Sequence, residues 1–174
     1  MNTFKKGEKI MSAKLKICAL LSVIFSMVCA AETTIKWDCG NPPPAKFKIG
    51  NKSVIRNIGD KKYLISESNY DFARFFTNLA ANESFKFTVS GTAVEDGKKS
   101  SIGAIAFKYE NKKWNQVRNL GWKKVLPYGK NAVVNFEMPA KNVSAGRYMI
   151  IFYRTGGKVA IQDITFTQNP ASEK

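Results

Sequence analysis

The stretch Ser84-Phe-Lys-Phe-Thr-Val-Ser90 decides the fold class of this chain. Its apolar residues Phe85, Phe87 and Val89 alternate with polar ones, so that one face of an extended strand would be buried while the other meets water. This period of two is typical of a half-buried antiparallel strand. Ala132–Met138 repeats the alternation, which predicts a second strand of the same kind.

The two strands expected nearest the C-terminus carry different signals. Arg147–Arg154 is apolar on both faces, which predicts a central strand covered on both sides. Lys158–Thr167 changes parity, because Ile161 and Ile164 would point to opposite faces of a regular strand. We therefore expect one extra residue, a β-bulge, near Gln162-Asp163, which would turn the carboxylate outward or toward the rim of the sheet.

The rest of the chain from residue 33 reads as short strands separated by turns rich in Gly, Asn, Asp and Pro. Tyr70–Leu79 also fits the spacing of a helix, but we favour a strand with Phe72 and Phe76 on one face, because the neighbouring segments are strands. This series of short strands, without an internal repeat or helix–strand alternation, predicts an all-β fold, an antiparallel β-sandwich or a barrel. The other expected strands are Thr33–Trp37, Phe47–Ile49, Ser53–Ile58, Tyr63–Ser66, Ile102–Glu110, Trp114–Leu120 and a separate one opening at Gly121.

Residues 1–30 have the organisation of a secretory signal peptide. Lys14 and Lys16 precede the apolar run Ile17–Val28, and a small-residue cleavage site follows. The run is shorter than the about 20 residues of a membrane-spanning helix. We therefore expect cleavage before Ala31 and no transmembrane segment after cleavage.

Three details of the N-terminus stay open. Glu32 is the alternative first residue of the mature chain, and Met11 is a more ordinary start for a signal peptide than the first residue. Cys29 lies where a lipoprotein would carry its acylated cysteine, but the residues before it match a bacterial lipobox poorly.

Cleavage would leave 144 of the 174 residues, enough for one core. We expect a single β-sandwich domain over residues 31–168 and a polar tail over 169–174. Residues 1–30 hold five lysines and one glutamate, which leaves 23 basic and 12 acidic residues and a net charge of +11. Such a charge favours anionic partners, although scattered lysine pairs are also typical of a solvated surface. Cys39 is then the one cysteine left. We favour a small buried apolar residue at this position. The alternative is a reactive thiol or one that pairs between chains.

The C-terminal half has a familiar order of segments: Trp122-Lys-Lys-Val125, the strand Ala132–Met138, the long strand from Gly146, and a Gly-Gly turn into the closing strand. Residues 84–167 resemble the galactose-binding-like jelly rolls of bacterial carbohydrate-binding modules. The resemblance implies a jelly-roll sandwich with a carbohydrate ligand. In those modules an Asp-Asp pair in the closing strand often helps to hold a structural calcium ion. This chain has Gln162 at the first position, which leaves Asp163 as the calcium ligand that the resemblance implies, and no other cofactor is expected.

The composition bears on catalysis. The chain has no histidine, which removes Ser-His and Cys-His nucleophile schemes and histidine-ligated metal sites. A pair of carboxylates would still suffice for glycoside hydrolysis. Most of the acidic residues fall in turns or on polar strand faces, where a solvated carboxylate is the default, so we predict a protein that is not an enzyme. The carboxylates concerned are Glu67, Asp71, Glu83, Glu95, Asp96, Glu110, Glu137 and Asp163.

The candidate ligand-binding residues are aromatic side chains beside turns, because an exposed ring offers a flat apolar surface to a sugar. Tyr109 and Trp114 flank the expected turn Asn111-Lys-Lys113, and Trp122 and Tyr128 lie around Gly121–Gly129. The alternative interpretation of the tryptophans is packing in the core or at its rim. Arg154 is the main candidate for polar contacts with the ligand, and Arg118 and Asn135 are further candidates.

Together these features predict an exported, non-catalytic bacterial domain, periplasmic or extracellular, that binds carbohydrate. The charge favours an acidic glycan or another anionic surface polymer. The alternative is a structural or accessory envelope protein that contacts other proteins and has no sugar ligand. Interleaved lysines and aromatics also suit single-stranded nucleic acid, but export argues against a specific nucleic-acid partner.

Overall fold

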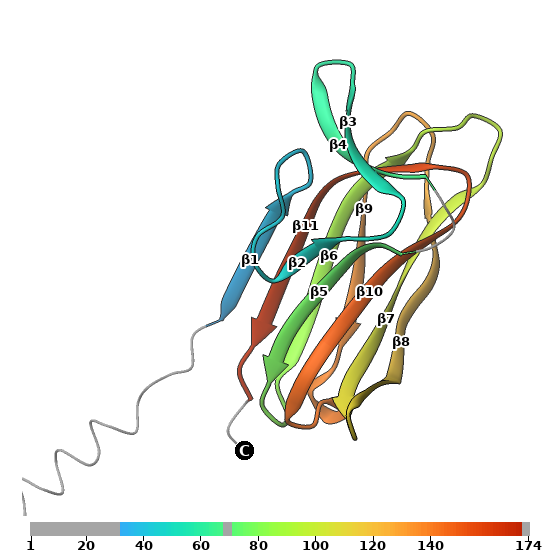
Figure 1. Cartoon of the computed structure of the whole chain (residues 1–174). Helices are drawn as coiled ribbons and strands as arrows, with labels where there is room; N and C mark the ends of the chain where they lie inside the picture. Colours follow the sequence, from blue (N-terminus) through green and yellow to red (C-terminus); the bar gives the residue numbers. More distant parts are fainter. Residues whose placement is uncertain (1–31, 68–70, 172–174) are drawn as a thin grey trace, which may run out of the picture. The chain divides into compact units, whose positions relative to one another are not determined.

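The computed structural model describes residues 32–67 and 71–171, which form two antiparallel sheets packed face to face (Figure 1). The antiparallel β-sandwich predicted from the sequence is confirmed, whereas the expected signal peptide lies outside the described residues. The strands are β1 (Thr33–Asp38), β2 (Phe47–Ile49), β3 (Ser53–Ile58), β4 (Lys61–Ser66), β5 (Asp71–Leu79), β6 (Ser84–Ala93), β7 (Ser100–Glu110), β8 (Lys113–Leu126), β9 (Ala132–Met138), β10 (Gly146–Gly156) and β11 (Val159–Asn169), and a 3-10 turn, η1 (Ala140–Asn142), follows β9.

The two sheets differ in the number and order of their strands. The six-stranded sheet has the order β3-β4-β11-β6-β9, with β1 added alongside β11. The five-stranded sheet has the order β2-β5-β10-β7-β8. All ladder pairings between these strands are antiparallel. Within the described part of the chain, no helix is long and apolar enough to cross a lipid bilayer.

The core lies between the sheets and is rich in phenylalanine. Phe87 of β6 and Phe166 of β11 project from the six-stranded sheet, and Phe75 of β5 and Phe152 of β10 project from the other; all four are fully buried. The ring centroids of Phe75 and Phe166 lie 4.3 Å apart, and those of Phe87 and Phe152 lie 4.9 Å apart. Burial of each such ring stabilises the fold by about 1.5–3 kcal/mol. The alternation that decided the fold class thus supplies one side of this core.

The central position predicted for the strand over Arg147–Arg154 and the bulge predicted near Gln162 are confirmed, whereas only one face of that strand is covered by the other sheet. β10 lies between β5 and β7 at the centre of its sheet. The pairing of β11 with β6 shifts register between Ile161 and Asp163, which makes Gln162 the extra residue of the expected bulge. The bulge lets Ile161 and Ile164 both face the core, where each is fully buried.

The strand expected over residues 70–79 is confirmed, but the faces assigned to it are wrong. The pairing of β5 with β10 shifts register near Ala73. As a result Phe72 and Phe75 both face the core, whereas Phe76 points to the outer face of the sheet and is only partly buried. A bulge of this kind changes the parity of every later residue in the strand.

The separate strand expected to open at Gly121 is also wrong. β8 is continuous and pairs along β7 through three register shifts. The glycine does not end the strand. A Cβ atom there would lie 3.0 Å from the ring of Phe136, so the small residue lets the edge strand approach the core. The irregularity is instead absorbed by bulges and by Lys123, whose φ of 53° is left-handed.

Candidate functional site

The outer face of the five-stranded sheet carries a strip of apolar and aromatic side chains. The pairing register puts Met149 of β10 between Phe76 of β5 and Phe107 of β7, and it puts Ile151 beside Ile105. Met149 is only 8% exposed because the side chains of the neighbouring strands cover it. The outer face of this sheet is therefore apolar along its central strand, which is unusual for a face that looks away from the core.

At one end of the strip lies a cluster that we call the Trp114 patch: Phe76, Tyr109, Trp114 and Arg147. The ring of Trp114 lies 5.3 Å from that of Tyr109 and 6.1 Å from that of Phe76, measured between centroids. The guanidinium carbon of Arg147 lies 5.7 Å from the centroid of Trp114. Four strands of the sheet, β5, β7, β8 and β10, thus bring three aromatic rings and one cation together.

The chain forms this patch through a two-residue turn. Asn111 and Lys112 have φ values of 53° and 62°, the left-handed conformation that joins two antiparallel strands without splaying them. Tyr109 and Trp114 are therefore directly opposite each other in the ladder of β7 and β8. The expected turn after β7 is confirmed, and it places both predicted aromatics on one surface.

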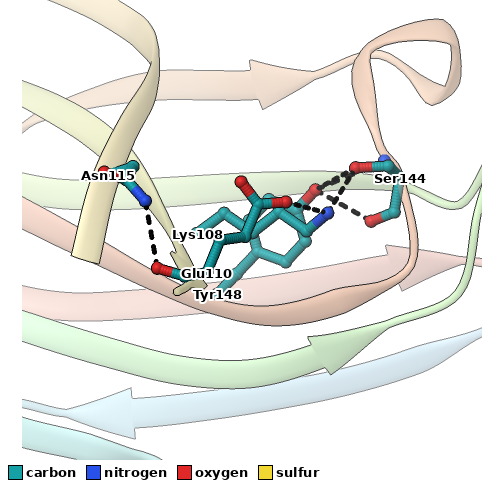
Figure 2. Close-up of polar contacts among 5 residues, drawn as sticks. All are labelled: Lys108, Glu110, Asn115, Ser144 and Tyr148. Carbon is teal, nitrogen blue, oxygen red and sulfur yellow. Dashed lines mark hydrogen bonds and ion pairs between the residues drawn. The ribbon is translucent and has the colours of Figure 1, made fainter. Parts of the chain in front are cut away.

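A polar network holds this hairpin close to its turn (Figure 2). Lys108 Nζ donates to Ser144 Oγ at 2.8 Å and lies 2.7 Å from Glu110 Oε1. The buried Tyr148 hydroxyl donates to the Ser144 carbonyl oxygen at 2.9 Å, and Asn115 Nδ2 donates to the Glu110 carbonyl oxygen at 3.3 Å. The hydrogen bond to Glu110 raises the pKa of the Lys108 ammonium group. Because the network ties the hairpin to the loop before β10, it fixes the position of the Trp114 patch.

A second cluster on the same face is the Trp122 patch, formed by Trp122 and Tyr153. Their ring centroids lie 4.7 Å apart, and Trp122 is 49% exposed whereas Tyr153 is 8% exposed. The Tyr153 ring lies across Gly103, where a Cβ atom would come within 2.2 Å of the hydroxyl oxygen. Burial raises the pKa of Tyr153 to about 12. Its hydroxyl group has no hydrogen-bond partner among the residues that the structure describes.

The four predicted aromatics do not form one continuous site. Tyr109 and Trp114 lie together. Trp122 shares their face but contacts Tyr153, which is opposite Gly103 in the ladder of β10 and β7, six residues before Tyr109 and thus roughly 20 Å away. Tyr128 lies after β8, where it forms a bridge to Ala93 at the end of β6 in the other sheet.

Arg154 points into the sandwich rather than to the outer face. It is 6% exposed, and its guanidinium group donates to Ser66 Oγ and to the carbonyl oxygens of Gly156 and Gly157. The sequence predicts that this residue supplies polar contacts to a ligand. Its donors are instead used in the interior, because β10 alternates faces and the residue has the parity of the buried Phe152.

Asp163 lies on the six-stranded sheet, away from both patches. It accepts a hydrogen bond from Ser90 Oγ and is opposite Asp38 in the ladder of β1 and β11. These two aspartates line a groove of about 480 Å³ together with Asp60, Lys36 and other residues. No group of three Asp, Glu, Cys or His side chains in residues 32–67 and 71–171 converges as a metal site. The calcium ion implied for Asp163 therefore stays a prediction without support from its neighbours.

Cys39 is the buried residue that we favoured. It is fully buried beside Asp163 and Asp38, and burial together with these two carboxylates raises the pKa of its thiol far above the usual range. A thiol that stays protonated is a poor nucleophile, which fits a packing role.

The carboxylates weighed as catalytic groups mostly have local partners. Glu83 accepts hydrogen bonds from the Ala80 amide and from Gln168. Five more form ion pairs with nearby basic side chains: Glu67 with Arg56, Asp71 with Arg74, Glu95 with Lys98, Glu110 with Lys108 and Glu137 with Lys86.

The sequence did not indicate Phe76, Arg147, Lys46 or Lys48, which all lie at the Trp114 patch. Lys48 Nζ lies 5.4 Å from the centroid of the Phe76 ring. The bulge in β5 changes which residues of the strand face the core. The alternation of apolar residues therefore does not predict that Phe76 lies on the outer face. Lys48 lies in β2, Lys46 directly precedes that strand and Arg147 lies in β10, so only the order of strands in the sheet brings these basic residues together.

No protein-family model matches this chain. No curated protein matches it either. Solved structures do resemble it. The CBM22-1 xylan-binding domain of Paenibacillus barcinonensis Xyn10C superposes with a TM-score of 0.60 at 7% identity, covering 82% of this chain and 98% of that one. The CBM22-2 xylan-binding domain of the same protein gives a TM-score of 0.54 at 10% identity, covering 76% and 98%.

A third similar structure contains a ligand. It holds the CBM22-1 and GH10 modules of Clostridium thermocellum Xyn10B with xylohexaose, and it gives a TM-score of 0.52 at 10% identity, covering 74% of this chain and 27% of that one. These likenesses establish the fold as the jelly-roll sandwich of carbohydrate-binding modules, which is the resemblance stated from the sequence. Because the sequence identities are 10% or less, these similarities show the fold alone.

Proposed function

We propose that this chain is an exported, non-catalytic carbohydrate-binding domain that holds a polysaccharide on the outer face of its five-stranded sheet. The observation that carries the proposal is the Trp114 patch, in which three aromatic rings and Arg147 share one face. The rings offer flat apolar surfaces to the C–H faces of a sugar. The guanidinium group and nearby amide side chains offer donors to its hydroxyl groups.

The fold supports the same function. The similar solved domains are described as xylan-binding, and they share the two-sheet architecture that presents this face. Fold alone does not specify function, so the proposal rests on the aromatic and basic residues of this chain.

The charge favours an acidic glycan over a neutral one. Cleavage of residues 1–30 would leave a net charge of +11. Lys46, Lys48 and Arg147 lie at or beside the Trp114 patch. A positive field on a binding face raises the local concentration of anionic ligands and speeds their association.

The proposal is tested by measuring binding of residues 31–174 to a panel of polysaccharides by affinity electrophoresis and isothermal titration calorimetry. The panel includes xylan, a neutral glucan, polygalacturonate and a sulfated dextran. We expect saturable binding to at least one polysaccharide, weakened by added salt for the anionic ones. Absence of binding to every member contradicts the proposal.

An accessory envelope protein without a sugar ligand is the second candidate. The observation that favours it is the β3–β4 hairpin, which projects beyond the rest of the sandwich (Figure 1) and carries Ile58, 41% exposed, at its tip. An exposed apolar residue on a projecting element is a feature of protein contacts. This candidate predicts that Ile58→Asp abolishes co-purification with an envelope protein, and that the polysaccharide panel shows no binding.

A further inference from the structure

A small cleft opens beside the Trp114 patch, where the loop before β2 meets β5 and β10. Its volume is about 220 Å³, and it is lined by Lys46, Phe76, Thr77, Asn78 and Arg147. The backbone fixes this arrangement. The Phe76 amide donates to the Lys46 carbonyl oxygen at 2.9 Å, and Arg147 is opposite Asn78 in the ladder of β10 and β5.

The cleft has two cations and no acidic side chain in its lining. In the described part of the chain, neither Lys46 nor Arg147 forms an ion pair with a carboxylate. The larger groove on the other sheet differs, because its three lysines are balanced by Asp38, Asp60 and Asp163. A concave site with uncompensated positive charge favours an anion.

Arg147 is also held in place beside the cleft. Its guanidinium group lies over Trp114, and this contact limits the rotamers of an otherwise exposed side chain. The planar fork of an arginine matches the paired oxygen atoms of a carboxylate or a sulfate group. Asn78 adds a neutral amide donor to the lining of the same cleft.

We propose that the cleft between Lys46 and Arg147 binds the carboxylate or sulfate group of an acidic sugar whose ring packs against the aromatic rings of the Trp114 patch. This inference rests on the proposed function, since it names the class of ligand that the same face takes. The cleft and the aromatic patch share Phe76 and Arg147, so one sugar residue contacts both.

The test compares matched polymers and matched variants in residues 31–174. Polygalacturonate and its carboxyl-reduced neutral counterpart differ only in the acid group, and dextran sulfate against dextran gives the same comparison for sulfate. Lys46→Gln removes one cation of the cleft. Lys130→Gln makes the same charge change at an exposed position between β8 and β9, outside the residues that line the cleft.

We expect Lys46→Gln to weaken binding of the preferred anionic polymer by about three- to tenfold at low salt and to reduce the salt dependence. Lys130→Gln changes affinity by less than about twofold, and binding of the neutral counterpart is the same in Lys46→Gln as in the wild type. Loss with polygalacturonate alone identifies a carboxylate ligand, and loss with dextran sulfate alone identifies a sulfate ligand.

Two results overturn the inference while leaving the proposed function standing. One is equal binding of an anionic polymer and its neutral counterpart. The other is an equal effect of Lys46→Gln and Lys130→Gln, which would assign the charge preference to the whole surface. Failure of every polymer to bind overturns both the inference and the proposed function.

Discussion

Arg154 Nε of β10 donates to Ser66 Oγ of β4 at 3.2 Å, and this hydrogen bond joins the two sheets of the sandwich. Both residues are buried, at 6% and 1% exposed. The same guanidinium group donates to the carbonyl oxygens of Gly156 and Gly157 in the turn from β10 to β11. Burial lowers the pKa of Arg154, so these hydrogen bonds hold a charge that water would otherwise solvate better.

Arg154→Met is therefore expected to lower the free energy of unfolding. Removing the guanidinium group leaves the buried Gly157 carbonyl oxygen, the partly buried Gly156 carbonyl oxygen and the Ser66 hydroxyl without this donor, which costs about 1–3 kcal/mol of unfolding free energy. The measurement is urea unfolding followed by tryptophan fluorescence. Arg118→Met, at an exposed position of β8, serves as the control and should change stability by less than about 0.5 kcal/mol. Unchanged stability with lost glycan affinity would instead restore Arg154 as a ligand-binding residue.

Trp114→Ala is expected to act on binding. The substitution removes the ring that contacts Phe76, Tyr109 and Arg147, so affinity for the best polysaccharide of the panel should fall about tenfold, or ~1.4 kcal/mol. Titration calorimetry measures the change. Tyr128→Ala removes an aromatic ring that is 54% exposed but lies away from the patch, and it should leave affinity unchanged. The reverse order of effects would move the site to the end of β8.

Gly103 and Tyr153 give a prediction about packing. A Cβ atom at position 103 would come within 2.2 Å of the Tyr153 hydroxyl oxygen, so Gly103→Ala should cost about 1–3 kcal/mol through overpacking. Tyr153→Phe removes a buried hydroxyl group that has no partner among the described residues, and it should leave stability equal or higher. Thermal unfolding of the two variants measures whether stability falls in Gly103→Ala and is equal or higher in Tyr153→Phe. A clear loss of stability in Tyr153→Phe would mean that the hydroxyl group is hydrogen-bonded in solution.

The β-sandwich, most strand positions and the bulge in β11 could be predicted because alternation records which face of a strand is buried. The bulge in β5 could not. Its parity change falls where Phe72, Phe75 and Phe76 are all apolar, so the alternation does not distinguish the inner face from the outer one. For the same reason the sequence did not indicate that Phe76 belongs to the Trp114 patch.

The candidate site was only partly predictable for a related reason. Tyr109 and Trp114 are near each other in sequence, and a hairpin brings them together. Arg147 joins them only through the order of strands in the sheet, which no local pattern specifies. The strand of Arg154 is apolar on both faces, so polarity alone did not show that this basic side chain points into the interior.

Glu95 gives a prediction about pH. Its carboxylate accepts a hydrogen bond from the Lys158 amide at 3.1 Å and lies 3.4 Å from Lys98 Nζ. The backbone hydrogen bond, with a smaller effect of Lys98, holds the pKa of Glu95 below its ordinary value. A group whose pKa is lower in the folded state stabilises the fold when ionised, so this contribution is present above about pH 4.3 and is lost as the pH falls through the folded-state pKa.

Glu95→Gln should therefore flatten the dependence of unfolding free energy on pH below about pH 4.3, as measured by urea unfolding at a series of pH values. Lys98→Met keeps the backbone hydrogen bond and removes only the ion pair, so it should change the slope less. If Lys98→Met changes the slope more than Glu95→Gln, the ion pair rather than the hydrogen bond dominates at this position. Equal slopes in Glu95→Gln and the wild type would mean that the link from the turn after β6 to the start of β11 does not persist in solution.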